Sequence, residues 1–198
     1  MGQQMERAAE ILRFWFGNPE DSDGEYGQQR QVWFKKDPGF DDRIRRCFLT
    51  DYERAAAGDL KAWRHEPRPC LALVILLDQF PRNLFRGDAR SFASDRAARD
   101  TADHALAQGY DQQVLPVERI FFYLPLEHSE NWADQERSVA LVRSLHAAHP
   151  EFESTLDYAL RHREVIQRFG RFPHRNEILG RETTPEEAEF LQQPGSRF

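Results

Sequence analysis

The amino-acid sequence predicts an all-α fold, because helical patterns recur along its 198 residues and strand patterns are almost absent. Apolar residues return every three or four positions, which is the period of an amphipathic helix. Glycines and prolines stand between these stretches, where helices stop and start. Together these observations predict about seven to nine helices joined by short connections. We expect one domain over residues 1–198, since no linker or low-complexity tract divides the chain.

Two amphipathic helices are expected near the start of the chain. Residues 6–16 place their apolar side chains on one face, and a glycine stops this helix. A polar loop is expected over residues 18–27. Asp37 and Pro38 then supply an N-cap and a first-turn proline for the second helix. Its large apolar residues lie four apart, and Gly58 ends it.

The most apolar stretch of the sequence, Leu71–Leu77, predicts the central helix of the fold. We expect this helix to open at Pro69. A helix with no polar face has to be covered on all sides, so it belongs in the middle of the protein. The stretch is far too short to span a bilayer, which favours a soluble protein.

Five further helices are expected in the second half of the chain. The first is rich in alanine, which permits close packing, and Pro125 is expected to end the second. A capping box with Thr184 as N-cap opens the last. The five helices are expected over residues 92–108, 116–124, 131–149, 152–169 and a short segment from residue 185.

Two stretches nearly repeat each other: Phe80-Pro81-Arg82-Asn83 and Phe172-Pro173-His174-Arg175-Asn176. Each follows a helical segment. Proline cannot continue a helix and biases the preceding residue to extended geometry. We therefore expect two rigid helix exits, each of which presents an arginine–asparagine pair. Rigid turns with fixed hydrogen-bond donors suit a binding site.

Composition and motifs exclude several classes of protein. The net charge is −6 and the charges are interspersed, which argues against a nucleic-acid partner. The two cysteines, Cys47 and Cys70, form no metal or disulfide pattern, so a reduced, cytoplasmic setting is expected. There is no apolar leader, phosphate loop, nucleophile elbow or zinc motif. We expect no metal, cofactor or membrane partner, and the oligomeric state is left open.

Asp78 is the first candidate site residue. It is expected at the C-terminal end of the central helix, where the helix dipole and the apolar surroundings disfavour a carboxylate. It therefore needs a cation or a proton, and Arg82 and Arg86 are the local candidates. A structural ion pair that fixes the turn is an equally good interpretation.

A second group of candidates, Glu127-His128-Ser129-Glu130, precedes the helix that Asn131 caps. Three titratable residues in four resemble an acid/base or metal cluster. The spacing is not one that metal ligands require, however, and acidic residues also favour the positive end of a helix.

His162 is expected to point inward, because its helical neighbours on the same face are apolar. A satisfied core histidine and a residue lining the same cavity as Glu127 and His128 are both open interpretations. Arg175 is expected to pair with Asp78 or Glu127. A buried charge needs a partner, so we predict that the segments of these three residues meet.

Several segments of the chain resemble a bacterial family known as domain of unknown function 924. The resemblance covers residues 7–192, and its set of motifs is specific. It implies a compact, TPR-like fold of antiparallel helix pairs, and it implies no activity. The matching segments are Ile11–Gly17, Trp33-Phe34, Leu76–Asn83, Leu124–Glu130 and Gly170–Asn176.

The preferred hypothesis is a protein that binds a small anionic ligand, or an acidic peptide end, in a polar cleft. The alternative is an enzyme of hydrolase or lyase type, with Glu127 or His128 as general acid/base and arginines stabilising negative charge. A third interpretation is a purely structural salt-bridge network. The expected ligand-binding residues are Asp78, Arg82, Asn83, Glu127, His128, Glu130, His162, His174, Arg175 and Asn176.

Overall fold

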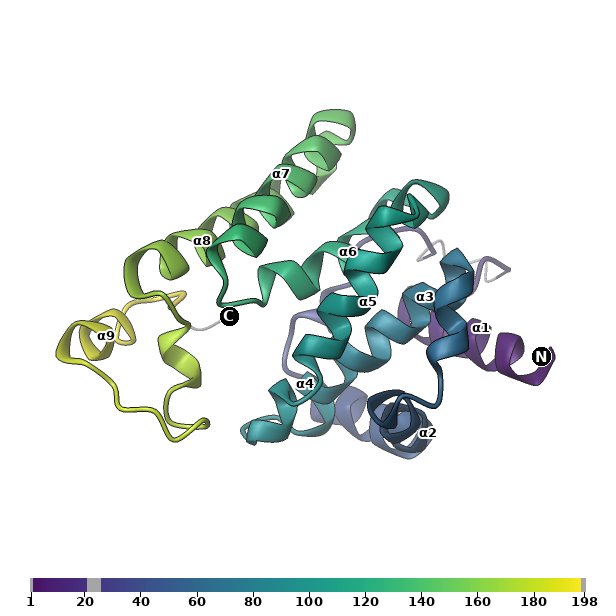
Figure 1. Ribbon diagram of the computed structural model, residues 1–198, viewed down its shortest axis with the longest axis horizontal. Helices are drawn as coiled ribbons and strands as arrows, with labels where there is room; N and C mark the ends of the chain where they lie inside the picture. Colours follow the sequence, from purple (N-terminus) through teal and green to yellow (C-terminus); the bar gives the residue numbers. More distant parts are fainter. Residues whose placement is uncertain (1, 21–25, 197–198) are drawn as a thin grey trace. The chain divides into compact units, whose positions relative to one another are not determined.

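The computed structural model describes residues 2–20 and 26–196, and within them it contains helices and no strand (Figure 1). The predicted all-α fold is confirmed. Residues 21–25 of the expected polar loop lie outside the described residues. The α-helices are α1 Gly2–Phe16, α2 Pro38–Ala57, α3 Pro67–Val74, α4 Phe80–Leu84, α5 Asp95–Ala107, α6 Pro116–Glu127, α7 Trp132–Ala148, α8 Glu153–Phe169 and α9 Pro185–Phe190.

The contacts divide the chain into two compact units. Unit 1 comprises Met1–Arg86 and Arg90–Pro125, and unit 2 comprises Gly87–Ala89 and Leu126–Phe198. Each unit is described by itself. The single domain over residues 1–198 and the TPR-like arrangement stay predictions.

Helix α2 begins and ends where the sequence predicts, whereas α1 ends at Phe16 as predicted but begins at Gly2 rather than at residue 6. The Asp37 side chain accepts hydrogen bonds from the amides of Gly39 and Phe40 and so caps α2. Gly58 ends α2 in the left-handed conformation, with φ at 86°, which a residue with a side chain rarely adopts. The apolar face of α1 is buried, including Ile11 and Trp15.

Helix α3, a π-helical turn over Ile75–Gln79 and α4 follow one another without a break, so residues 67–84 form one continuous helix. The helix opens at Pro67 rather than at Pro69. Because the helix continues through Pro81 to Leu84, the predicted helix exit at Pro81 is wrong. Asp78 consequently lies inside this helix and not at its C-terminal end, so the argument from the helix dipole does not apply to it.

The backbone around Pro81 explains why the helix continues. Proline has no N–H, and its ring crowds the carbonyl four residues earlier, which is that of Leu77. The helix widens to a π turn at this point, and the Phe80 amide donates to the Ile75 carbonyl, five residues back. The Ser94 hydroxyl donates to the Leu77 oxygen at 2.6 Å. A side chain thus supplies the hydrogen bond that the proline cannot.

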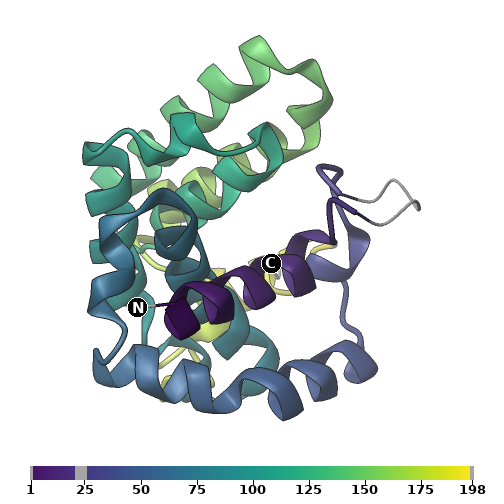
Figure 2. The same ribbon diagram turned by 90° about the vertical axis from the view of Figure 1, so that its right-hand side faces the viewer.

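The continuous helix forms the centre of unit 1, as its apolar sequence predicts. Every residue of Leu71–Leu77 is at most 3% exposed. Helix α3 packs against α1 and α5, and α4 packs against α2 (Figures 1 and 2). Neighbouring helices cover the continuous helix along its length, which explains why this helix has no polar face.

Helix α6 also contains a proline that was expected to end it. Pro125 lies within the helix, which runs on to Glu127. The predicted end at residue 124 is wrong, and Glu127 belongs to the helix rather than to the connection after it.

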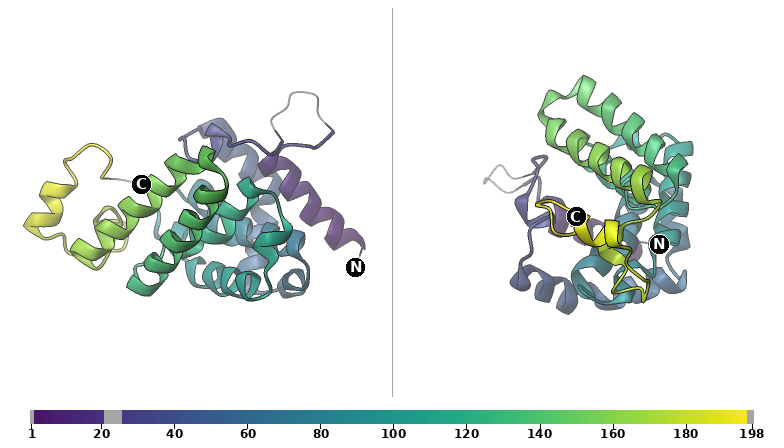
Figure 3. Two further views of the ribbon diagram at one scale, coloured as in Figure 1. Left: turned by 90° about the horizontal axis from the view of Figure 1, so that it is seen from above. Right: turned by 90° about the vertical axis from the view of Figure 1, so that its left-hand side faces the viewer.

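Unit 2 is built on α7 and α8, which pack along each other (Figure 3). The short connection at Pro150 makes the pair antiparallel. Asn131 caps α7, and Gly170 ends α8 with φ at 68°, both as predicted. The predicted capping box of Thr184 and Glu187 opens α9. No described helix combines the length and apolar character that crossing a membrane requires.

Candidate functional site

Seven of the ten predicted site residues lie in unit 2, on three segments: the end of α6 with the turn after it, α8, and the loop after α8. We call Glu127, His128, His162, His174 and Arg175 the histidine cluster. His162, His174 and Arg175 lie around the ring of Phe172, and Glu127 and His128 lie beside His162. The other two residues, Glu130 and Asn176, fix the loop that carries Phe172.

Gln135 positions the first segment of the histidine cluster. Its side-chain amide donates to the carbonyls of Glu127 at 2.6 Å and Ser129 at 2.7 Å. Gln135 is fully buried on α7. The turn after α6 is therefore held against α7, which fixes the direction of the Glu127 and His128 side chains.

The Glu127 carboxyl group lies 3.2 Å from Nδ1 of His162, and both side chains are buried. The same nitrogen lies 2.9 Å from the Tyr158 carbonyl, one turn earlier in α8. Both neighbours accept hydrogen bonds, so Nδ1 carries the proton and the imidazole lone pair is on Nε2. His162 faces inward, as its helical position predicts, and it lies beside Glu127.

Phe172 is the aromatic centre of the cluster. Its ring centroid lies 5.5 Å from that of His162 and 5.6 Å from that of His174. The Arg175 guanidinium lies 4.7 Å from the same ring centroid and donates to the His128 carbonyl at 3.0 Å. The rings of His128 and His162 are 6.2 Å apart. Two imidazoles and one guanidinium thus lie around one phenyl ring, and a third imidazole, that of His128, lies beside His162.

Burial, and then the neighbouring His128, lower the pKa of His162 to about 3. Burial, and then the positive charge of Arg175, lower the pKa of His174 to about 3. Both imidazoles are therefore neutral at pH 7, while Arg175 is charged. Titratable groups with strongly shifted pKa values concentrate at functional sites, although structural networks also shift them.

Glu130 has a structural partner that the sequence analysis did not single out. Arg181 donates to both of its carboxylate oxygens, at 2.7 and 3.0 Å, and the Phe172 amide donates to one of them at 2.8 Å. Burial raises the pKa of Glu130, but the hydrogen bonds from Arg181 outweigh it and the pKa is lowered. Glu130 therefore holds the loop that carries Phe172.

Asn176 is fully buried and donates to Glu187 at 3.1 Å. Arg171 forms a bidentate pair with the same carboxylate, at 2.6 and 2.9 Å. Hydrogen bonds from Arg171 lower the pKa of Glu187 to about 2. The capping-box pattern predicts Glu187 as a helix-cap residue, but nothing in the sequence indicates that it also anchors the loop after α8.

The remaining three predicted residues lie in unit 1 and form contacts of their own. Asp78 is fully buried, and its carboxylate lies 3.4 Å from the Arg82 guanidinium. Arg82 also pairs with Asp95 at 3.0 Å, and Gln79 donates to Asp78 at 2.6 Å. Burial lowers the pKa of Arg82, but Asp78 and then Asp95 outweigh it, so the pKa is raised and the guanidinium stays charged.

Asn83 belongs to a neighbouring contact with α2. Its side chain donates to Asp41 at 2.7 Å, and Arg86 pairs with the same carboxylate at 3.1 Å. The partner identified for Arg86 is therefore Asp41, whereas Arg82 is the partner identified for Asp78. The meeting of the Asp78 segment with those of Glu127 and Arg175 stays a prediction. Among residues 2–20 and 26–196, no group of three or more histidine, cysteine or acidic side chains is arranged to hold a metal.

The fold and these contacts define an all-helical protein whose second unit contains a buried cluster of histidines with a carboxyl group and an arginine. The chain belongs to the family described as bacterial protein of unknown function, DUF924, whose model matches residues 11–195. A protein of unknown function from Agrobacterium tumefaciens, whose structure has been solved, has a sequence 42% identical to that of this chain. That similarity covers 96% of this chain and 98% of the other, with a TM-score of 0.83. No match was found among curated proteins.

Proposed function

We propose that this protein binds a small ligand carrying a carboxylate or another anionic group, or an acidic peptide end, at the histidine cluster. The observation that supports the proposal is that the His162 and His174 imidazoles and the Arg175 guanidinium lie around Phe172, with the His128 imidazole beside His162. These residues come from three separate segments. A guanidinium and imidazole N–H groups donate hydrogen bonds to an anion, and an imidazole that takes up a proton also becomes positively charged.

The protonation states support the same choice. His162 and His174 are neutral in the ligand-free protein because burial lowers their pKa values. A bound anion favours the protonated form of a nearby imidazole, so its pKa rises when the ligand binds. Binding then takes up protons, and the affinity for the anion increases as the pH falls. This dependence separates the histidine cluster from a surface arginine site, whose charge is constant.

The experiment is a thermal denaturation screen of small mono- and dicarboxylates and inorganic phosphate, because a ligand that binds the folded state raises its melting temperature. The central variant is His128→Gln, since His128 is only partly buried and glutamine keeps a polar side chain of similar reach. We expect His128→Gln to weaken binding by about tenfold, the cost of one charge-assisted hydrogen bond. The matched control is His65→Gln, an exposed histidine in unit 1.

Three outcomes are informative. Binding that strengthens from pH 7 to pH 5 in the parent protein, as the bound anion raises histidine pKa values from about 3, and that is weakened only by His128→Gln supports the proposal. Equal binding by both variants contradicts it. If no anion raises the melting temperature while His128→Gln lowers it markedly, the cluster is a structural network, which is the third interpretation of the sequence.

A second candidate function is acid/base catalysis, and the Glu127–His162 contact favours it. A carboxyl group that accepts a hydrogen bond from Nδ1 of a histidine fixes its tautomer and leaves Nε2 to take a proton, as in the general base of many hydrolases. The His162 pKa of about 3 in the ligand-free protein means that this function requires a substrate that raises the pKa. The pair is Glu127 with His162, rather than the Glu127 or His128 expected from the sequence. Hydrolysis of simple activated esters that is lost in His162→Gln and retained in His65→Gln supports this function. A rate unaffected by His162→Gln excludes it.

A further inference from the structure

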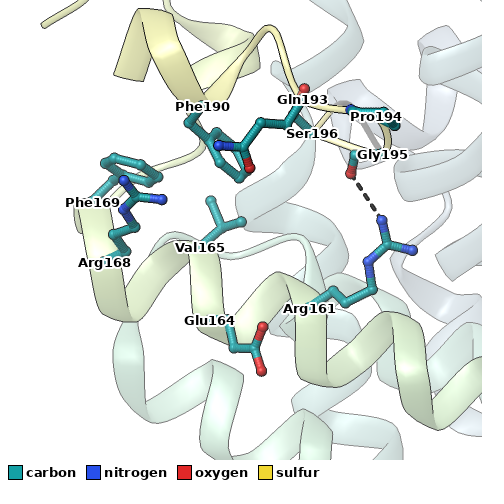
Figure 4. Close-up of a pocket in the computed structure, with 10 residues that line it drawn as sticks. All are labelled: Arg161, Glu164, Val165, Arg168, Phe169, Phe190, Gln193, Pro194, Gly195 and Ser196. Carbon is teal, nitrogen blue, oxygen red and sulfur yellow. Dashed lines mark hydrogen bonds between the residues drawn. The ribbon is translucent and has the colours of Figure 1, made fainter. Parts of the chain in front are cut away.

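A pocket of about 310 Å³ opens between α8, α9 and the segment that follows α9, all within unit 2 (Figure 4). Its volume is at the lower end of the range of small-molecule sites. None of the ten predicted site residues lines it, so it is separate from the histidine cluster. The pocket is lined by Arg161, Glu164, Val165, Arg168, Phe169, Phe190, Gln193, Pro194, Gly195 and Ser196.

The floor of the pocket is apolar. Val165 is 5% exposed, and the rings of Phe169 and Phe190 lie 5.1 Å apart. These residues belong to one apolar cluster that also contains Ile166 and Phe172. The pocket is therefore the open side of a packed cluster. A flat apolar group that covers Phe169 and Phe190 removes their exposed surface from water, which is favourable.

Two arginines stand at the edge of this floor, seven residues apart on α8. Seven residues are about two helical turns, or roughly 10.5 Å, so Arg161 and Arg168 share one face. Arg161 donates to the Gly195 carbonyl at 3.0 Å. Gly195 has φ at 75°, and the Arg161 guanidinium occupies the space that a side chain at this position would need. Glycine thus allows the chain to close over the end of the pocket.

Arg168 is held in place but keeps hydrogen-bond donors for a ligand. Its guanidinium lies 4.7 Å from the Phe169 ring centroid, and Figure 4 shows the two side by side at the edge of the pocket. Its Nε donates to Glu186 at 2.9 Å. A guanidinium has five N–H donors, and among the described residues the structure gives the Nη atoms of Arg168 no acceptor.

We propose that this pocket binds a small aromatic monocarboxylate, with its ring on Phe169 and Phe190 and its carboxylate on the Nη atoms of Arg168. The ring matches the apolar floor, and the carboxylate matches the fork of donors in a guanidinium. Glu164 also lines the pocket, and its carboxylate is unfavourable for any negative charge on the ligand that Arg168 does not pair. Because Arg168 is already stacked and paired, binding loses little of its side-chain freedom.

Benzoate is the probe, and the full chain is titrated with it by calorimetry. Three further compounds remove one feature each: benzyl alcohol lacks the charge, acetate lacks the ring, and phthalate adds a second carboxylate. We expect benzoate to bind more tightly than all three. Binding of acetate equal to that of benzoate overturns the proposal, because it shows that the apolar floor makes no contribution. Absence of benzoate binding at millimolar concentrations overturns it as well.

The variant Arg168→Gln tests whether benzoate binds in this pocket. Arg168 is exposed and its pair with Glu186 lies at the surface, so the substitution leaves the fold intact. We expect benzoate affinity to fall by about tenfold or more through the loss of a charge-assisted pair. Arg143→Gln, an exposed arginine of α7 outside the pocket, is the matched control and keeps parent affinity. Equal loss in both variants, or loss in neither, overturns the proposal.

The two proposals for this protein fail separately, because no residue that lines the pocket belongs to the histidine cluster. His128→Gln is expected to leave benzoate binding unchanged, and Arg168→Gln is expected to leave anion binding at the histidine cluster unchanged. Benzoate binding that is weakened by His128→Gln and unaffected by Arg168→Gln assigns the ligand to the histidine cluster and overturns the assignment to this pocket.

Discussion

The two Phe-Pro segments of this protein have similar sequences and different structures. Residues 80–83 continue a helix that runs from Pro67 to Leu84, whereas residues 172–176 follow a helix that Gly170 has already ended. In the first segment, a π turn and the Ser94 hydroxyl compensate the backbone for the proline. In the second, Phe172 is extended and Pro173 opens a short 3-10 helix. The effect of a proline thus depends on what distant residues offer its backbone neighbours.

The arginines of the two segments differ in the same way. Arg82 lies between two carboxylates, those of Asp78 and Asp95. Arg175 donates to a backbone carbonyl and lies over an aromatic ring beside two histidines. The first arginine neutralises a buried charge, and the second contributes positive potential to a cluster. The following predictions test how the two Phe-Pro segments and their surroundings differ, from the largest expected effect to the smallest.

Arg82→Met is expected to lower the free energy of unfolding by about 3–5 kcal/mol, because it removes the cation from a fully buried Asp78. Arg175→Met is expected to cost only about 1–3 kcal/mol, since it removes a hydrogen bond to a carbonyl and keeps contact with Phe172. Urea denaturation of both variants measures the difference. Equal losses would show that the two arginines have the same structural role.

Stability is expected to fall with acidification because of the histidine cluster. His162 and His174 have pKa values of about 3 in the folded protein and about 6.5 when unfolded, so below pH 6.5 the unfolded chain binds protons that the native state does not. Each histidine then lowers the free energy of unfolding by up to about 1.4 kcal/mol per pH unit, down to about pH 3. His162→Gln should reduce this slope in denaturant titrations, and His65→Gln should not.

Ser94→Ala is expected to destabilise the protein by about 1–3 kcal/mol, because it leaves the buried Leu77 carbonyl without the hydroxyl that compensates for Pro81. Amide hydrogen exchange should accelerate around residues 78–84 more than elsewhere in unit 1. Ser144→Ala, at an exposed position of α7, is the control. An unchanged stability would mean that the π turn alone accommodates the proline.

Thr184→Ala is expected to cost about 1 kcal/mol, the usual value of a helix N-cap. The effect should extend beyond α9, because Glu187 also binds Arg171 and Asn176. Nuclear magnetic resonance shifts should therefore change at Asn176 as well as in α9. Shift changes confined to α9 would show that the capping box does not affect the loop that carries Phe172.

Much of the fold could be predicted from the sequence, because its signals are local. The caps at Asp37, Asn131 and Thr184, and the glycines that end α2 and α8, act through neighbouring backbone groups. The two prolines inside helices were predicted wrongly. The hydroxyl of Ser94 and the π turn that accommodate Pro81 depend on tertiary packing, which a local rule cannot include.

The candidate site was predictable in part. Charged and polar residues beside apolar sequence drew attention to seven residues that lie in unit 2, and their role as a site stays a prediction. The pairing was not predictable: Glu127 lies beside His162 on another helix, and Arg181 binds Glu130 from 51 positions away. Arg181 follows a glycine and belongs to no recognisable sequence pattern, so the sequence does not indicate that its partner is Glu130. The pocket over Phe169 and Phe190 was missed because its residues resemble an ordinary amphipathic helix.

The π turn over Ile75–Gln79 also has a consequence for the evolution of the chain. A π-helical turn corresponds to an α-helix with one residue inserted, and each residue of an α-helix rotates the chain by about 100°. Deletion of one residue from this turn would give a regular helix, but it would rotate Arg82 and Asn83 away from Asp95 and Asp41. The number of residues between positions 67 and 84 is thus constrained by these contacts, whichever apolar residues form the helix. Substitutions that keep this length are expected to be tolerated more readily than a single deletion.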